Sequence, residues 1–342
     1  MKSFYKQLLS VISIFSLGII AYSNTFFCSF YYDDLPFIVL NPAIKNISDL
    51  QHIWNFLPCR FILYLSFALN YHFSHLNVFG YHLVNLLVHL GSAIFVWWLT
   101  LLTFSTPVMK EERIACHANI IALLAGLVFV AHPIQTESVT YILQRAASMA
   151  TLFYLASLCL YIKARLLQGE GLASSQGRIY YISSLITAIM AMFIKEITIT
   201  LPLMILFYEI SFFKTKLNFI WKQLLPFLLT ILIIPLTMLF TQSSKSISAR
   251  EMQSVIQGST QISSMHYLLT QFRVMLTYIR LVFLPFNQNL DYDYPIFKSL
   301  FEWPILISYL FLITILFWAK CLYSSNRIVS FFYLFVFFDA VT

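Results

Sequence analysis

The chain has 342 residues, of which 60% are hydrophobic and only 10% are charged. A typical soluble domain has roughly 45–50% apolar and about 25% charged residues, so this composition excludes a soluble globular protein. It predicts an all-α polytopic membrane protein. The formal net charge of +7 does not indicate nucleic acid as a partner, because the cations of membrane proteins gather in cytoplasmic loops.

Nine apolar segments approach the roughly 20 residues that a helix needs to cross a bilayer. They cover residues 7–29, 78–103, 118–132, 146–163, 179–194, 197–213, 223–241, 303–320 and 328–338. The last segment has only about half the length of a full crossing. The sequence therefore predicts a single transmembrane domain over residues 1–342. Two long outer loops are expected within it, at 30–77 and 242–302.

The lysines and arginines predict the orientation of the chain. Pairs or groups of them fall before the first span and in every second loop, at Lys2, Lys6, Lys110, Arg113, Lys163, Arg165, Arg178, Lys214, Lys216, Lys222, Lys320 and Arg327. The alternate short turns carry one cation each, Arg145 and Lys195. Since cations favour the cytoplasmic side, the N-terminus is expected in the cytoplasm.

Both long outer loops are expected to contain helices at the membrane surface. Residues 59–73 are apolar but too short to span comfortably, which is typical of an interfacial helix. Within 265–286, five polar residues share one helix face: His266, Thr270, Arg273, Thr277 and Arg280. This helix either lines a cavity or lies on the surface with its arginines reaching toward water. Asp291 and Asp293 follow in what we expect to be a solvated loop.

Two adjacent carboxylates, Asp33 and Asp34, stand in the aromatic segment FYYDDLPFIVLNP directly after the first span. Such a pair at a water-exposed membrane surface suits a general base or a divalent-cation site. In an extended segment the two side chains point to opposite faces, so only one of them is expected to face a reaction. Pro36 favours an extended or interfacial segment here.

Other ionisable residues are expected at the same outer face. His132 and Glu137 follow the third span, Arg145 begins the fourth, and Lys195 and Glu196 form the turn between the fifth and sixth. Charges near the hydrocarbon boundary tend to pair or to serve a site. The cations could bind a phosphate. The alternative is that Glu137–Arg145 and Lys195–Glu196 form ordinary ion pairs within loops.

The sequence offers weaker signals for a metal or a disulfide. His82, Asn85 and His89 form one stripe on the second span, and this spacing favours hydrogen bonds between helices over a metal site. Cys28 and Cys59 are the two cysteines that could both lie outside and pair. There is no P-loop, no GxGxxG and no GxSxG motif, which removes the usual signatures of nucleotide and serine-hydrolase sites.

Six segments occur in an order that resembles a known family. They are YYDDLPFIVLNPAI, RFILYLSFALNYHF, NVFGYHLVNLLVHL, AHPIQTESVTYILQRAASMATLFYL, KEITITLPLMILFYE and QFRVMLTYIRLVFLPFNQNLDYDYP. The series resembles the membrane region of bacterial relatives of the transmembrane and tetratricopeptide-repeat O-mannosyltransferases, within the GT-C class of glycosyltransferases. The resemblance extends from about residue 20 to about residue 320, and it is the ordered set that makes it specific.

The resemblance implies a function. A sugar, possibly mannose, would move from a polyprenyl-phosphate-linked donor in a bacterial inner membrane to a protein or glycan hydroxyl on the extracytoplasmic face. It implies that Asp33 or Asp34 acts as base or binds the acceptor or a divalent cation. It further implies that seven residues shape the site and hold the lipid phosphate: His132, Glu137, Arg145, Lys195, Glu196, Arg273 and Arg280.

The chain departs from the family pattern at its C-terminal end. Relatives continue with further spans and then tetratricopeptide repeats, whereas this sequence stops at FFYLFVFFDAVT. We therefore expect a C-terminally shortened form. Two other classes of function stay open at this point: a transporter or flippase of lipid or sugar, and an inactive membrane scaffold. Transporters tend to place ionisable groups near the membrane midplane, which the predicted outer clustering disfavours.

Overall fold

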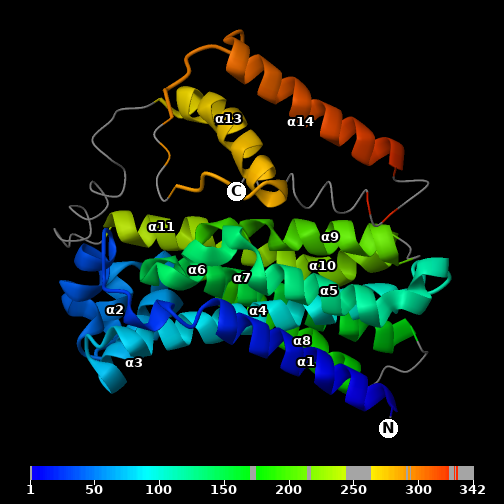
Figure 1. Ribbon diagram of the computed structural model, residues 1–342, viewed down its shortest axis with the longest axis horizontal. Helices are drawn as coiled ribbons and strands as arrows, with labels where there is room; N and C mark the ends of the chain where they lie inside the picture. Colours follow the sequence, from blue (N-terminus) through cyan, green and yellow to red (C-terminus); the bar gives the residue numbers. More distant parts are fainter. Residues whose placement is uncertain are drawn as a thin grey trace. The chain divides into compact units, whose positions relative to one another are not determined.

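A computed structural model describes residues 2–169, 175–213, 217–243, 263–289, 292, 294–322, 327 and 329 (Figure 1). All regular structure in these residues is helical, which confirms the predicted class. The chain divides into two compact units, Met1–Ala249 and Arg250–Thr342, and each is described by itself. Asp291, Asp293 and nearly all of the expected span 328–338 lie outside the described residues.

Unit 1 consists of long helices joined by short helical turns, which carry the label η. The long helices are α1 (Lys2–Ala21), α4 (Val78–Phe104), α5 (Ala118–Ala131), α7 (Arg145–Gly169), α8 (Ser175–Met192), α9 (Leu201–Phe212), α10 (Leu217–Thr230) and α11 (Ile233–Ser243). The connecting elements are η1 (Thr25–Phe27), η2 (Leu35–Val39), η3 (Pro42–Ile44), α2 (Leu50–Phe56), η4 (Pro58–Arg60), α3 (Phe61–Ser74), η5 (Arg113–His117), η6 (Pro133–Gln135), α6 (Thr136–Thr140), η7 (Ile142–Gln144) and η8 (Glu196–Thr200).

The long helix α4 is the centre of unit 1. It packs against α1, α5 and α7, and α7 packs in turn against α8. Figure 1 shows these helices side by side, with α2 and α3 gathered at one end of them. Ile14, Leu90 and Val130 form part of the buried core where α1, α4 and α5 meet. The apolar faces of these three helices therefore pack against one another within the bundle.

The polar stripe on α4 joins that helix to other segments. The His82 Nε2 atom lies 2.9 Å from the Cys28 carbonyl oxygen, and the His89 Nε2 atom lies 3.1 Å from the Val130 carbonyl oxygen. The Asn85 side-chain amide donates to the Ile142 carbonyl at 3.3 Å. The prediction that this stripe makes hydrogen bonds between helices is confirmed.

Five helices in the described residues are long and apolar enough to cross a membrane, and they indicate an integral membrane protein. They are Val78–Phe104, Arg113–Ala131, Ile142–Gln168, Ile220–Phe240 and Trp303–Leu322. They correspond to the predicted spans 78–103, 118–132, 146–163, 223–241 and 303–320. The remaining predicted spans do not reach this length and hydropathy in the part of the chain that is described.

Three predicted spans differ from the observed helices for local reasons. The first, 7–29, ends early because α1 stops at Ala21 and the chain turns into η1. The span 197–213 yields an α9 of only 12 residues, because Pro202 starts that helix after the 3-10 turn of η8. The span 223–241 corresponds to Ile220–Phe240, which is long enough to cross, but a turn at Ile231 and Leu232 divides it into α10 and α11.

The expected interfacial helix at 59–73 is α3, and one of its faces packs on the bundle. Leu63, Tyr64 and Phe67 on that face are buried, and the Phe67 ring stacks on Tyr81 of α4 with 6.3 Å between centroids. Phe73, on the other side, is exposed. The helix therefore contributes to the wall of unit 1 as well as presenting an apolar side outward.

Unit 2 contains two described helices, α13 (Ser264–Phe283) and α14 (Trp303–Leu322), which pack against each other. Ser263 caps α13 by accepting a hydrogen bond from the His266 amide. Between the helices, Leu269, Phe297 and Ile305 form a small buried cluster. The predicted helix at 265–286 is thus present and ends slightly earlier than expected.

Candidate active site

The segment that carries the two aspartates folds as a tight turn, so of the two alternatives, extended or interfacial, the extended chain is not the one observed. Tyr32 has a positive φ of 53°, which turns the backbone sharply just before Asp33. Pro36 lies in the first turn of η2, a position that suits its fixed φ. The Asp33 carbonyl oxygen accepts a hydrogen bond from the Phe37 amide at 3.2 Å.

Asp34 is fully buried and its carboxylate is used by the backbone. Its Oδ1 atom accepts a hydrogen bond from the Leu143 N–H at 2.8 Å, and its Oδ2 atom accepts one from the Tyr31 N–H at 3.3 Å. Burial raises the pKa of Asp34 to about 6, although these hydrogen bonds oppose the shift. Asp34 therefore ties the turn to η7.

Asp33 is half-buried and lies beside Tyr141. Its backbone N–H donates to the Tyr141 hydroxyl at 3.2 Å, and the Tyr141 ring packs against Tyr31 with 4.9 Å between centroids. Burial, followed by the negative charge of Asp33, raises the pKa of Tyr141 above its ordinary value. Of the two aspartates, Asp33 is the one whose side chain reaches solvent.

The segment from His132 to Gln144 forms short turns rather than a loop without structure. The His132 Nδ1 atom accepts a hydrogen bond from the Ile134 amide at 3.2 Å and so caps η6. The Glu137 Oε1 atom accepts one from the Gln144 side chain at 3.1 Å. Burial raises the pKa of Glu137, while this hydrogen bond and the charge of Lys195 oppose the shift.

Arg145 is fully buried at the start of α7 and is held by neutral groups. It donates to the Asn85 Oδ1 atom at 2.7 Å and to the Tyr81 carbonyl oxygen at 3.0 Å, and its guanidinium lies 4.5 Å from the centroid of the Phe67 ring. A further donor points to the Ser66 carbonyl oxygen at 3.4 Å. Arg145 thus joins α3, α4 and α7 directly beneath the turn region.

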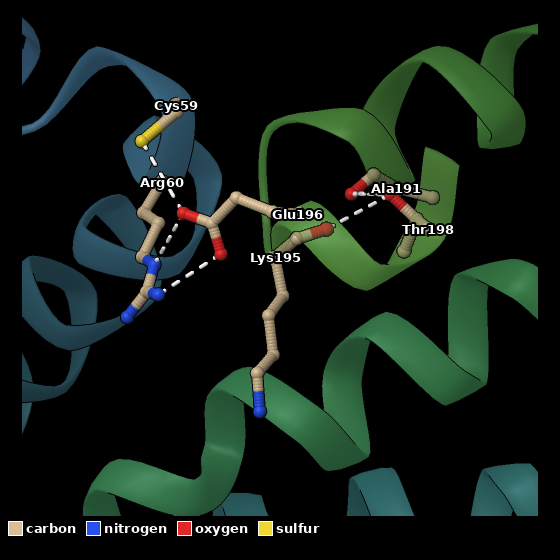
Figure 2. A network of polar contacts seen from close by, with 6 residues as sticks. All are labelled: Cys59, Arg60, Ala191, Lys195, Glu196 and Thr198. Atoms are coloured by element: carbon tan, nitrogen blue, oxygen red, sulfur yellow. Dashed lines mark hydrogen bonds and ion pairs between the residues drawn. The ribbon is translucent and has the colours of Figure 1, made fainter. Parts of the chain in front are cut away.

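Glu196 forms its ion pair with Arg60 of the first long loop. The Arg60 Nη2 atom lies 2.9 Å from the Glu196 Oε2 atom, and the Arg60 Nε atom donates to Oε1 at 3.1 Å (Figure 2). The Cys59 thiol also donates to Oε1 at 3.5 Å. Burial opposes ionisation of Glu196, but the hydrogen bonds and charge of Arg60 outweigh it and lower the pKa of Glu196.

The alternative of ordinary loop ion pairs is therefore wrong for both pairs. Within the described residues, Glu196 pairs with Arg60 and not with Lys195, and Glu137 accepts from Gln144 and makes no ion pair with Arg145. The side chain of Lys195 leads away from the Arg60–Glu196 pair (Figure 2). Its pKa is lowered by burial and next by the charge of Arg60.

These contacts bring together four segments of unit 1 that are far apart in sequence. The turn at Asp33 meets Tyr141, η4 meets η8 through Arg60 and Glu196, and Lys195 interacts electrostatically with Glu137. Together with the buried Asp34 and Arg145, they form the candidate site. Arg60 and Tyr141 belong to it but were not predicted, since a single cation or tyrosine in a loop carries no distinctive sequence signal.

Arg273 and Arg280 lie on α13 in unit 2 and line a pocket there. The pocket has a volume of about 700 Å³ and is otherwise lined by Leu276, Thr277, Ile279, Phe283, Leu284, Tyr292, Tyr294 and Phe311. The Arg273 Nη1 atom donates to the Thr277 hydroxyl at 3.2 Å. Three of the five polar residues of the predicted helix face, Arg273, Thr277 and Arg280, therefore line this pocket, which agrees in part with the alternative of a face that lines a cavity.

Among the described residues, the structure shows neither a cluster of metal ligands nor a disulfide. No group of three or more His, Cys, Asp and Glu side chains that could hold a metal ion occurs among the residues described. Asp34 is already engaged by two backbone amides, so the aspartate pair does not present two open carboxylates. Cys28 and Cys59 are both free thiols, so the disulfide considered from the sequence does not form.

The sequence has several curated relatives. It is 31% identical over 226 residues to Protein O-mannosyl-transferase TMTC2 of Homo sapiens, a match that covers 62% of this chain and 25% of that protein. It is 34% identical over 172 residues to the Xenopus laevis tmtc2 protein, covering 46% of this chain and 19% of that protein. The chain is similar to protein O-mannosyl-transferases. It is also 30% identical over 201 residues to Protein O-mannosyl-transferase TMTC4 of Homo sapiens, a match that covers 54% of this chain and 27% of that protein.

These similarities support a relationship to GT-C-like membrane glycosyltransferases, as the ordered motifs suggested. The matches extend over only about a fifth to a quarter of the length of these relatives. No protein-family model matches the chain. No solved structure matches it either.

Proposed function

We propose that this chain is a membrane glycosyltransferase that moves a sugar, with mannose as the first candidate, from a polyprenyl-phosphate-linked donor to a hydroxyl of a protein or glycan acceptor. The observation that carries the proposal is the division between the two aspartates. Asp34 is buried and bonded to backbone amides, whereas Asp33 reaches solvent beside Tyr141. The similarity to protein O-mannosyl-transferases supplies the reaction class.

In this proposal Asp33 is the general base. Its carboxylate takes the proton of the acceptor hydroxyl as the hydroxyl oxygen forms a bond to the anomeric carbon of the sugar. The bond from that carbon to the lipid phosphate breaks, and the phosphate leaves with the electron pair. A half-buried carboxylate suits this task, because it keeps contact with water while its position is fixed by the Asp34 turn.

Lys195 is assigned to the leaving phosphate, because an ammonium group stabilises the charge that develops there. His132, Glu137 and Glu196 are assigned to shaping the pocket around it, and Arg145 to positioning the helices below it. Arg273 and Arg280, in their own pocket, supply two cations beside Tyr292 and Tyr294, which suits an anionic lipid headgroup.

We place the site on the extracytoplasmic face of a bacterial inner membrane, with the N-terminus in the cytoplasm. The support for this orientation is the distribution of lysines and arginines along the sequence. Donor lipid, acceptor and membrane lipid are then the partners. A divalent cation is not required by the assigned roles, since Asp33 acts alone as base.

The test is a transfer assay with purified protein in lipid nanodiscs, polyprenyl-phosphate mannose and a Ser/Thr-rich peptide. We expect Asp33→Asn to reduce kcat by about 100-fold or more, which is the range for loss of a general base. The matched control is Glu112→Gln, which removes an exposed carboxylate and should leave transfer unchanged. Added EDTA should have no effect.

Three outcomes would contradict the proposal. Full transfer by Asp33→Asn would remove the assigned base. A flippase would be favoured if folded wild-type protein transfers none of the lipid-linked sugars tested but moves the labelled lipid between the two leaflets of vesicle membranes. Absence of both activities would favour a scaffold.

A further inference from the structure

The ion pair between Arg60 and Glu196 lies directly next to the lysine assigned to the phosphate. It is bidentate, with contacts of 3.1 and 2.9 Å, and its side chains are 25% and 30% exposed. A planar guanidinium matched to a carboxylate in this way is a strong and directional pairing. Glu196 is thereby committed to a partner that comes from a different loop.

Lys195 is left without such a partner. Its backbone is extended, with φ −156° and ψ 145°, so its side chain and that of Glu196 leave the chain in different directions (Figure 2). In the part of the chain that the structure describes, no carboxylate lies within ion-pair distance of the Lys195 ammonium. A half-buried cation that has no ion pair among the described residues therefore stands beside a neutralised pair.

We propose that Arg60 is a positioning residue that holds the Glu196 carboxylate and so keeps Lys195 available to an anionic group of the substrate. This inference rests on the proposed function, in which that group is the donor phosphate. If Arg60 is removed, the Glu196 carboxylate loses its ion-pair partner and still acts electrostatically on Lys195. An unpaired carboxylate one residue away would then compete with the phosphate.

The electrostatic influences on Lys195 agree with this role. Apart from burial, the charge of Arg60 lowers the pKa of Lys195, while the charges of Glu196 and Glu137 raise it by smaller effects. The intact Arg60–Glu196 pair therefore places no net negative charge beside Lys195 that would compete with an anionic ligand. Loss of Arg60 alone would leave both carboxylates acting on Lys195 with no cation to oppose them.

A purely mechanical role for the ion pair is the alternative, but other contacts already join the two segments. The N–H of Ile62, two residues after Arg60, donates to the carbonyl oxygen of Phe193, three residues before Glu196, at 3.1 Å. The Trp54 and Phe193 rings pack with 5.9 Å between centroids. The connection between η4 and η8 therefore does not depend on the charges alone.

The experiment measures binding of polyprenyl phosphate to the purified full chain in detergent, by ligand-induced stabilisation over a concentration series. The variants are Arg60→Gln, Glu196→Gln, the double variant and Arg60→Lys. We expect Arg60→Gln to weaken binding about tenfold, the scale of one charge-assisted hydrogen bond. The double variant should bind several-fold more tightly than Arg60→Gln, because the competing carboxylate is gone. Arg60→Lys should retain most of the affinity.

The double variant separates the two roles of the pair. If Arg60 only clamps the segments, the double variant will bind as weakly as Arg60→Gln or more weakly, and the inference is overturned. Lys195→Gln tests the underlying proposal independently, since it should weaken binding in every background. If Lys195→Gln binds like wild type, the phosphate assignment itself fails. If Lys195→Gln binds weakly while the double variant is not rescued, only the role of Arg60 fails.

Discussion

The Asp34 carboxylate accepts a hydrogen bond of 2.8 Å from the backbone N–H of Leu143, which lies 109 residues further along the chain. This single contact fixes the turn after α1 against the turn before α7. It also distinguishes the two adjacent aspartates, because it draws Asp34 inward and leaves Asp33 beside solvent. The position of the assigned base thus depends on its neighbour.

The first prediction concerns the pH dependence that Asp34 gives to stability. Burial raises its pKa from 3.8 to about 6, so the folded state binds this proton more readily than the unfolded state. Its stabilising contribution is therefore complete below pH 3.8 and is lost as the pH rises through 6. When the pH falls from 8 to 5, the free energy of unfolding of wild type should rise by roughly 1 kcal/mol relative to that of Asp34→Asn.

The measurement is the difference in thermal midpoint between wild type and Asp34→Asn in detergent at the two pH values. Taking the difference between the proteins cancels the titration of all other groups. A difference that is the same at pH 5 and pH 8, or one that favours wild type more at pH 8, would contradict the assigned shift.

The second prediction concerns Arg145. Its cation is fully buried and satisfied by Asn85 and Tyr81, so Arg145→Gln should leave these acceptors without donors. We expect a loss of about 1–3 kcal/mol in stability, the usual cost of leaving a buried hydrogen-bond acceptor unsatisfied. The matched control is Arg113→Gln, because Arg113 is exposed at η5 and its removal should be close to neutral. Equal midpoints for the two variants would rule out the structural role.

The helices of this protein could be predicted well where the apolar runs are long and unbroken. The segment 78–103 appears as α4 with one residue added, because nothing in it interrupts the helix. The predicted span 223–241 is present as Ile220–Phe240, but a turn at Ile231 and Leu232, shortly before Pro235, divides it into α10 and α11. Hydropathy counts apolar residues and does not register such breaks.

The candidate site could be predicted only in part. The sequence indicated that Asp33, Glu137 and Lys195 share one region, and contacts and electrostatic interactions link them in unit 1. The partners could not be deduced, because they come from distant segments. Arg60 is 136 residues away from Glu196, whereas the sequence offered only the adjacent Lys195 as a partner. A pattern of neighbours cannot rank contacts that the fold creates.

The third prediction concerns a buried ion pair that the sequence did not indicate. Arg165 of α7 and Glu209 of α9 are joined at 2.6 Å, and Tyr161 also donates to Glu209 at 3.1 Å. Glu209→Gln should destabilise the protein by about 3–5 kcal/mol, because it leaves a buried guanidinium without its counter-charge. Thermal unfolding in detergent measures the effect.

The control for this pair is the double variant Arg165→Gln with Glu209→Gln. It removes both charges, so it should be less destabilised than Glu209→Gln alone. The effect of the double variant minus the sum of the effects of Arg165→Gln and Glu209→Gln gives the coupling energy of the pair. Additive effects of the two single variants would show that the charges do not interact. Transfer activity is not needed for this measurement.

The last prediction compares two helical glycines that differ in the space around them. A Cβ atom on Gly126 would lie 2.6 Å from the Ile14 Cδ1 atom and 3.4 Å from the Ala93 carbonyl oxygen, where α1, α4 and α5 pack closely. A Cβ atom on Gly177 would meet nothing nearer than 3.6 Å. Alanine favours a helix over glycine by about 1 kcal/mol at either position. Gly177→Ala should therefore raise the thermal midpoint, whereas Gly126→Ala should lower it, because overpacking costs about 1–3 kcal/mol and exceeds that gain. A higher thermal midpoint for both variants would show that α1 can shift away from α5 at little cost. A lower thermal midpoint for both would show that helix propensity does not govern the Gly177 site.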